Sequence, residues 1–245
     1  MLVVGLTGGI GCGKSTVSTK LSKDFKIPVI DADKIARQVV QPGEKAYEAI
    51  VLHFRGKIPE LIDSTNGNLN RAALGQWAFS HPEDLKQLNR ITHPAIRYEI
   101  FKQIITCYLK GYKMCILDVP LLFESSLDTF CGVSISVVCD EETQIRRLTQ
   151  RNPTMSTEEA KNRIKSQMQI GERIARSDYV IENNLDLPAL YAQVENVVHQ
   201  IKPNFARYAL EYFPPFGCVS AAAVILIKSF RKRAMGDRQI KSSNN

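Results

Sequence analysis

A glycine-rich stretch at the start of the chain constrains its fold more than any other feature. Residues 1–16 read MLVVGLTGGIGCGKST, and residues 8–15 fit the pattern G-x-x-x-x-G-K-[ST]. Glycines at these places let the backbone curl so that its N–H groups point inward, and a helix that follows adds the positive end of its dipole. An apolar run precedes the pattern, and Val17, Leu21 and Phe25, spaced four apart, predict a helix after it. The stretch therefore predicts a phosphate-binding loop between a strand and a helix.

The residue types in this loop predict how a nucleotide binds. Lys14 can reach the β- and γ-phosphates as a point charge, and the hydroxyl group of Ser15 can supply one ligand to Mg²⁺. A dinucleotide-binding fingerprint is excluded, because Lys14 stands where its third glycine would be. The residues expected to bind a nucleotide together with Mg²⁺ are Gly8, Gly9, Ile10, Gly11, Cys12, Gly13, Lys14, Ser15 and Thr16.

Short apolar runs recur along the chain and alternate with helical patterns. Further strands are expected at residues 27–30, 115–117, 132–139 and 178–181, and helices at residues 141–151 and 187–201. Strands that alternate with helices are typical of a parallel sheet covered by helices on both faces. The predicted fold is an α/β fold of the P-loop NTPase type, with a five-stranded parallel sheet in three α/β/α layers.

Two carboxylates, Asp31 and Asp33, follow the second expected strand. The carboxyl ends of parallel strands face the ligand crevice, so we expect one or both side chains to lie near the phosphate loop. An aspartate there can remove the proton of a hydroxyl group that attacks the γ-phosphate. Asp33 is the first candidate for this base and Asp31 the second. The alternative, which stays open for Asp31, is that it caps the helix that follows.

Residues 44–110 carry a largely helical pattern that is too long for a simple crossover between two strands. We interpret this stretch as an inserted subdomain that holds the second substrate. Arg71, His93 and Arg97 are candidates for contacts to anionic groups of that substrate. In the alternative interpretation each is solvated or locally paired, and His93, which precedes Pro94, caps a helix over residues 95–109.

Asp118 ends the third expected strand, where a Walker-B carboxylate holds Mg²⁺ directly or through water. A turn-forming aspartate before Pro120 is the alternative. Asn183 follows the fifth expected strand, at an edge that suits the adenine of the nucleotide.

Arginines mark a predicted pair of helices after the fourth strand. Arg147 and Arg151 lie four residues apart and share a helix face, and a second helix, from residue 156 to about 175, carries Arg163 and Arg173. Such a pair can form a lid that closes guanidinium groups onto the transferring phosphoryl group and excludes water. The alternative is a solvated basic helix paired with nearby glutamates.

Cysteine content and charge narrow the class of protein. The six cysteines form no C-x-x-C pair, so no zinc site is expected, and reduced thiols suit a cytosolic protein. Because the first strand begins at residue 2, we expect no signal peptide.

The net charge is +7; residues from 228 onward hold six basic residues and one acid, which leaves +2 for the rest. No RNA-binding signature accompanies this charge, so no nucleic-acid partner is expected.

The C-terminal extension combines an apolar segment with the basic cluster. Residues 216–227 are twelve mostly apolar residues, fewer than the roughly 20 that span a bilayer, and basic residues follow from Lys228. One hypothesis is peripheral or tail-anchored attachment to the cytosolic face of the mitochondrial outer membrane or the endoplasmic reticulum. The alternative is a helix packed on the core with a basic end.

Several motifs together are close to family-specific. They are GLTGGIGCGKS at residues 5–15, DADKIAR at 31–37, NRAAL at 70–74, ITHP at 91–94, DVPLLFE at 118–124, QIRRLTQR at 144–151 and DYVIEN at 178–183. In these residues the chain resembles the dephospho-CoA kinase family, in its eukaryotic monofunctional form. The resemblance implies ATP-dependent phosphorylation of the ribose 3′-hydroxyl of dephospho-CoA, the last step of coenzyme A synthesis. A complex with other enzymes of that pathway stays open.

The resemblance also implies a division of the chain and roles for its residues. It gives a kinase domain at 1–202, with a nucleotide-binding core at 1–42 and 112–202, a CoA-binding subdomain at 43–111, a lid at about 152–168, and an extension at 203–245. Asp33, Lys14, Arg147 and Arg151 would be catalytic, and Asp31 would help to bind the acceptor.

Three rival functions remain to be compared. Another small-molecule P-loop kinase, for shikimate or a nucleoside monophosphate, would differ in its acceptor. A GTPase would need Asn-Lys-x-Asp, whereas residues 183–186 read NNLD. A non-catalytic membrane-bound scaffold would have no use for the lysine and the carboxylate at positions 14 and 33.

Overall fold

The computed structural model describes residues 1–203 together with residues 219, 222, 223 and 226. The chain divides into two compact units: unit 1 comprises residues 1–30 and the chain from 107 onward, and unit 2 comprises residues 31–106. Most of the extension that was expected to anchor or pack lies outside the described residues. Within the described part, none of the helices combines the length and the apolar character needed to cross a membrane.

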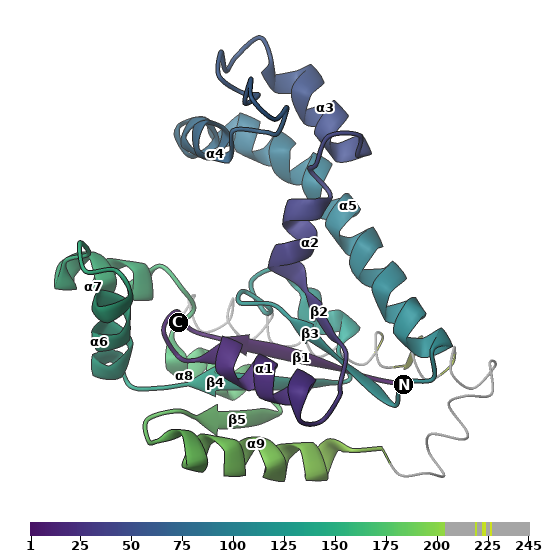
Figure 1. Cartoon of the computed structure of the whole chain (residues 1–245), viewed down its shortest axis with the longest axis vertical. Coiled ribbons are helices and arrows are strands. Elements are labelled where there is room, and N and C mark those ends of the chain that lie inside the picture. Colours follow the sequence, from purple (N-terminus) through teal and green to yellow (C-terminus); the bar gives the residue numbers. More distant parts are fainter. Residues whose placement is uncertain (204–218, 220–221, 224–225, 227–245) are drawn as a thin grey trace, which may run out of the picture. The chain divides into compact units, whose positions relative to one another are not determined.

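Unit 1 is built on a five-stranded parallel sheet, which confirms the predicted fold class (Figure 1). Its strands lie in the order β2-β3-β1-β4-β5, so that β1 is central, with Val4 opposite Ile116 of β3 and Leu6 opposite Ile135 of β4. The strands are β1 (Leu2–Gly8), β2 (Val29–Asp31), β3 (Met114–Asp118), β4 (Val133–Val138) and β5 (Tyr179–Glu182).

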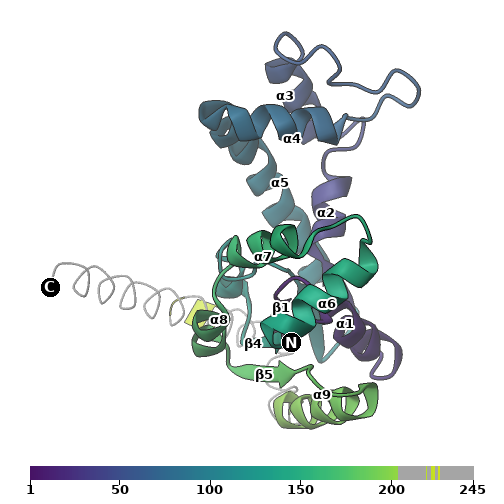
Figure 2. The same cartoon turned by 90° about the vertical axis from the view of Figure 1, so that its left-hand side faces the viewer.

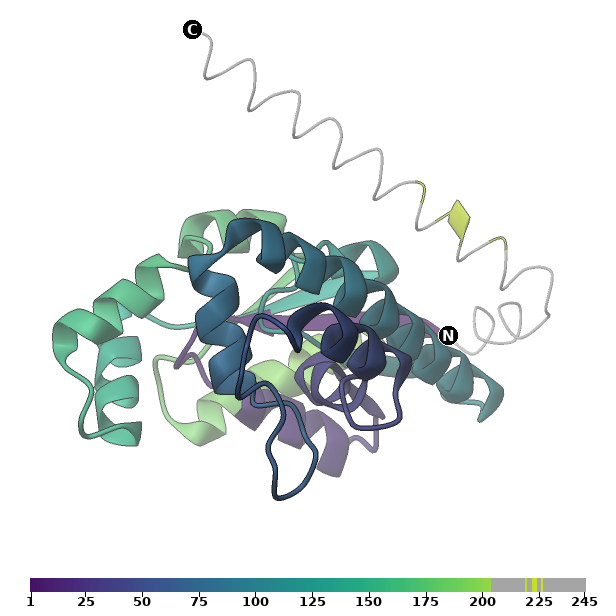
Figure 3. The same cartoon turned by 90° about the horizontal axis from the view of Figure 1, so that it is seen from above.

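Side chains of β1 alternate between two apolar layers, as the period of a strand requires. Val4 and Leu6 are fully buried in a core with α1 and α9, which lie side by side along one face of the sheet (Figures 1 and 2). On the other face, a Cβ at Gly5 would lie 2.7 Å from Leu122 and 2.8 Å from Cys131, so only glycine fits there. Figure 3 shows the chain from above.

Three of the five described α-helices of unit 1 begin after a residue whose side chain caps them. The five are α1 (Lys14–Lys23), α6 (Glu141–Arg151), α7 (Thr157–Lys165), α8 (Ile170–Arg176) and α9 (Leu187–Ile201), with a short 3-10 helix η1 (Leu127–Phe130). Side chains of Asp140, Ser156 and Asp186 each accept a hydrogen bond from a backbone N–H three residues on. The predicted helices at 141–151 and 187–201 are confirmed.

Unit 2 is helical. It holds α2 (Ala32–Gln38), α3 (Lys45–Phe54), α4 (Arg71–Ser80) and most of α5 (Pro82–Leu109). Its buried core includes Ile50, Phe54, Leu61 and Leu74. The boundary therefore places α2 with the helices that follow it, whereas the sequence suggested a boundary near residue 43.

A polar cluster around Asp84 joins three elements of unit 2. One carboxylate oxygen accepts from His53 Nε2 at 3.0 Å and from Lys57 Nζ at 2.5 Å, and the other accepts from Trp77 Nε1 at 2.8 Å. Lys57 contributes most to holding the pKa of Asp84 well below its usual range, and Trp77 and His53 add to the effect. The cluster fixes α5 to α4 and to the end of α3.

Two helix predictions were wrong. The helix expected at 95–109 begins at Pro82 and runs through Pro94, and His93 therefore lies within a helix and caps none. Proline has no backbone N–H, so one helical hydrogen bond is missing at Pro94. Close to it, Thr92 Oγ1 donates to the carbonyl of Leu88 at 2.9 Å. The helix expected from 156 to about 175 is divided into α7 and α8, which are separated by residues 166–169.

Candidate active site

The phosphate loop has the backbone conformation that its glycines allow. Gly11 and Gly13 have φ angles of 77° and 88°, in the left-handed region that other residues rarely adopt. A side chain at Gly13 would also collide with the amide of Asn183. Lys14 begins α1, and Ser15 is exposed in its first turn, so the loop presents a helix N-terminus.

Three side chains from distant parts of unit 1 bind carbonyl groups of this loop. Gln144 Nε2 donates to Ile10 O at 2.7 Å, and Asn183 Nδ2 donates to Cys12 O at 2.8 Å. Arg147 donates to Gly11 O at 3.4 Å and to Asn183 O at 3.0 Å. Because donors hold its carbonyls, the loop is fixed with its N–H groups turned to the other side, where an anion can bind.

Lys14 forms an ion pair with Asp118 at the end of β3. Both side chains are largely buried, at 16% and 8% exposure, and Asp118 stands opposite Leu6 on the neighbouring strand β1. The strand order thus brings together the lysine and the carboxylate that the sequence singled out. A charge pair that is already buried favours a ligand that supplies both a phosphate for the lysine and a cation for the carboxylate.

The oxygen donors here suit Mg²⁺. The carboxylate of Asp118 and the hydroxyl group of Ser15 are hard ligands, and Mg²⁺ typically takes one or two such groups together with phosphates and water. Among the described residues no cluster of three or more His, Cys, Asp or Glu side chains could hold a metal ion by itself. The site therefore fits a cation that arrives with a nucleotide.

The four arginines expected on a lid lie in different surroundings. Arg147 braces the loop, and Arg151 is exposed at the last residue of α6. Arg163 pairs with Glu159 at 2.7 Å, which is the locally paired alternative. Arg173 is only 2% exposed and contacts the ends of β1 and β3, so its guanidinium does not lie on a solvent-facing lid.

Cys12 of the loop and Cys139, which follows β4, form a pair of buried thiols. Cys139 Sγ donates to Cys12 Sγ at 3.5 Å, and this bond lowers the pKa of Cys12 and raises the pKa of Cys139. The five described cysteines are free.

Unit 2 contains a cavity of about 390 Å³ that is lined by two of the predicted residues, Asp33 and Arg71. Asp33, Arg37 and Arg71 supply its charges, and Arg71 Nη2 donates to Arg37 O at 3.1 Å. The remaining wall is mostly apolar, with Asn89 and Thr92 as polar exceptions; the apolar residues are Ala36, Val40, Ile50, Leu69, Leu74, Leu88 and Ile96. This combination suits an anionic molecule that also carries an apolar part.

The other candidates in unit 2 lie apart from this cavity lining. Asp31 Oδ1 accepts from the backbone N–H of Lys34 at 2.9 Å, which is the capping role left open for it. His93 and Arg97 are exposed on α5 and do not line the cavity. Arg37 was missed, although it lies four residues after Asp33 and so shares its helix face.

Comparisons with known proteins agree on one family. The dephospho-CoA kinase family model matches residues 2–189. Dephospho-CoA kinase CAB5 of Saccharomyces cerevisiae is 60% identical over 233 residues, which cover 95% of this chain and 96% of that protein. Dephospho-CoA kinase of Geobacillus kaustophilus is 44% identical over 183 residues, 75% of this chain and 88% of that one. The solved structure of dephospho-CoA kinase from Campylobacter jejuni has a TM-score of 0.63 at 28% identity and covers 82% of this chain and 96% of its own.

Proposed function

The chain belongs to the dephospho-CoA kinase family, which catalyses the last step of coenzyme A biosynthesis, and on this premise we propose which residues carry out the reaction. The reaction transfers the γ-phosphoryl group of ATP to the ribose 3′-hydroxyl of dephospho-CoA. The single observation that carries the assignment of residues is the ion pair of Lys14 with Asp118 beside a braced phosphate loop.

ATP binds at the phosphate loop in this proposal. The loop and the N-terminus of α1 bind the phosphates, and Lys14 moves from Asp118 to the β- and γ-phosphates. Asp118 and Ser15 would hold Mg²⁺, which would supply positive charge to neutralise the phosphates. Arg151 supplies positive charge toward the transferring group, Arg147 contributes to catalysis by holding the loop through Gly11 O, and Asn183 lies next to the adenine.

The cavity of unit 2 binds dephospho-CoA in this proposal. Arg37 and Arg71 pair with phosphate groups of the acceptor, and the apolar wall receives its pantetheine chain. Asp33 accepts the proton of the 3′-hydroxyl as that oxygen attacks the γ-phosphorus. Asp31 orders the first turn of α2 around Asp33, and His93 and Arg97 are proposed to meet more distant anionic groups.

An acceptor screen tests this function. The purified protein is incubated with ATP and Mg²⁺ and with dephospho-CoA, shikimate or a nucleoside monophosphate, and products are identified by mass. We expect phosphorylated product from dephospho-CoA at a rate far above that from the other acceptors. Preferential phosphorylation of shikimate or a nucleotide would contradict the proposal, and so would the absence of ATP turnover.

We also propose that the extension after residue 203 attaches the enzyme to the cytosolic face of the mitochondrial outer membrane or the endoplasmic reticulum, close to other enzymes of the pathway. The apolar run at 216–227 and the basic residues from Lys228 support this, because such a cluster attracts an anionic leaflet by about 1 kcal/mol per basic residue. Truncation after Pro203 should leave kinase activity intact and move the protein to the soluble fraction. A full-length protein that is already soluble, or an unfolded truncated one, would favour a packed helix.

A further inference from the structure

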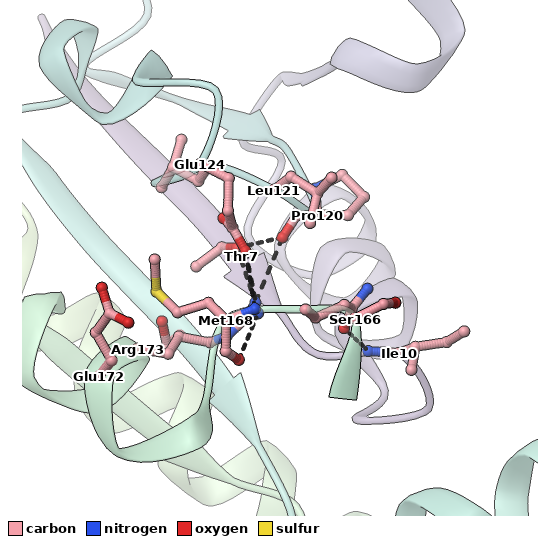
Figure 4. A network of polar contacts seen from close by, with 12 residues as sticks. Thr7, Ile10, Pro120, Leu121, Glu124, Ser166, Met168, Glu172 and Arg173 are labelled. Carbon is pink, nitrogen blue, oxygen red and sulfur yellow. Dashed lines mark hydrogen bonds and ion pairs between the residues drawn. The ribbon is translucent and has the colours of Figure 1, made fainter. Parts of the chain in front are cut away.

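A buried arginine lies under the carboxyl edge of the sheet without any role in the function proposed so far. Figure 4 shows Arg173 of α8 surrounded by Thr7, Pro120, Glu124 and Met168. Its guanidinium donates to Thr7 Oγ1 at 3.5 Å and to the carbonyls of Pro120 at 3.4 Å and Met168 at 3.5 Å. The Glu124 carboxylate lies 3.6 Å away and compensates the charge. A buried guanidinium is costly unless it is paired, so this arrangement points to a positional role.

These contacts fix the segment that links α7 to α8, residues 166–169. Arg173 binds the carbonyl of Met168, and Glu124 Oε1 accepts from the backbone N–H of the same residue at 3.4 Å. Two further partners of Arg173 are Thr7, near the end of the strand that leads into the phosphate loop, and Pro120, two residues after the strand that ends in Asp118. The segment is thereby attached to the two strands that build the nucleotide site.

Gln167, the neighbour of Met168, reaches the phosphate loop itself. Its Oε1 accepts from the backbone N–H of Ile10 at 2.9 Å. The N–H groups of such a loop are the atoms that face the phosphates, so a side chain bonded to one of them lies on the phosphate side. A backbone N–H can only donate, which means that the amide atom facing Ile10 is the oxygen and that the NH₂ end points away from it.

We propose that Gln167 is a further residue of phosphoryl transfer: it fixes the Ile10 N–H and donates its own amide N–H to the transferred phosphoryl group. Arg173 and Glu124 are positioning residues that hold Gln167 in place through Met168. The proposal rests on the function proposed above, because it needs ATP at the loop. Donors aimed at charge that develops during transfer act on turnover more than on the stability of the fold.

Gln167→Glu separates the two tasks of the side chain. Glutamate keeps an oxygen for Ile10 N–H but removes the amide donor and places a negative charge beside the phosphates. Turnover with ATP and dephospho-CoA should fall at least about 100-fold, the scale of losing an electrostatic donor. The unfolding midpoint should stay within about 2 °C of that of the unchanged protein.

Gln169→Glu is the matched control, with the same change two residues away. Gln169 is exposed, and its side chain makes no capping bond to α8. The control should keep turnover within about twofold, as surface substitutions usually do. The proposal is overturned if both glutamate variants lose turnover alike, or if Gln167→Glu behaves like the control. If the unchanged protein fails to phosphorylate dephospho-CoA, the proposed function fails instead, and the two failures are thus distinguishable.

A double-variant cycle tests whether Arg173 acts through Gln167. Gln167→Ala, which removes the same donor without adding a charge, should lower kcat/KM about 100-fold. Arg173→Lys alone should lower it less, and the double variant should be no worse than Gln167→Ala. Losses that multiply in the double variant would show an independent structural role and overturn the positioning proposal. If Arg173→Lys does not fold, Glu124→Gln, which keeps an acceptor for Met168 N–H, takes its place in the cycle.

Discussion

The phosphate loop of unit 1 is one continuous run of residues, whereas the cavity of unit 2 collects its lining from α2, α3, α4, α5 and the loop before α4. The loop offers backbone N–H groups, which recognise phosphate whatever molecule carries it. The cavity offers side chains, with Asp33, Arg37 and Arg71 set into an apolar wall. If the proposed function holds, the difference means that a general backbone device binds the donor nucleotide, while selection of the acceptor depends on dispersed side chains. Changes in the two regions should therefore have different kinetic signatures.

The largest effect should come from Asp33→Asn, which keeps the shape of the side chain but removes the proton acceptor. Turnover should fall by about 1,000-fold, within the usual range for a general base, while ATP binding by calorimetry stays unchanged. Asp31→Asn serves as the neighbouring control. If Asp31→Asn abolishes transfer and Asp33→Asn does not, the base has been assigned to the wrong carboxylate. If Asp33→Asn loses ATP binding as well, Asp33 helps to hold the metal ion that accompanies ATP.

Lys14→Ala should lower turnover by at least about 100-fold, because it removes a charge that stabilises the transferring phosphates. It also leaves Asp118 without its ion-pair partner, so some stability is lost too. Lys23→Ala, in the last turn of the same helix, is the control. Steady-state kinetics with thermal unfolding separate the two effects. Near-normal turnover in Lys14→Ala would contradict the assignment of the loop.

Arg71→Ala should raise KM for dephospho-CoA about tenfold with little change in KM for ATP, because one charged contact to the acceptor is lost. Arg55→Ala is the matched control, since Arg55 is exposed in unit 2 and does not line the cavity. Equal changes in both KM values would remove the distinction between the two regions.

The smallest effect on catalysis should come from Asp84→Asn, which acts on the stability of unit 2. Its depressed pKa means that ionised Asp84 stabilises the fold above the ordinary aspartate pKa and that this contribution disappears as the pH falls. The difference in unfolding midpoint between the protein and Asp84→Asn should therefore be largest near neutral pH and shrink in acid. KM for ATP should not change. A difference in unfolding midpoint that grows as the pH falls would contradict the depressed pKa of Asp84.

Local patterns were enough to predict the loop, the strands and the helices at 141–151 and 187–201. Lys14 and Asp118 were singled out separately. The strand order places β3, which ends in Asp118, next to β1, which leads into the loop before Lys14. The sequence could not predict that Gln167 and Arg173 reach the loop and the strand ends, because their partners lie far away in the sequence and no spacing rule connects them. The helix through Pro94 was missed because proline usually ends a helix. For Asp31 the sequence left two roles open, and the cap that the structure shows is a local contact with a residue three positions on.

One measurement tests the central claim most directly: the location, by phosphorus NMR, of the phosphoryl group transferred from ATP to dephospho-CoA. The account predicts that the phosphoryl group is found on the ribose 3′-oxygen, that coenzyme A forms in step with ADP, and that Asp33→Asn forms neither. Phosphate released into water without coenzyme A, or attached to another oxygen of the acceptor, would contradict it.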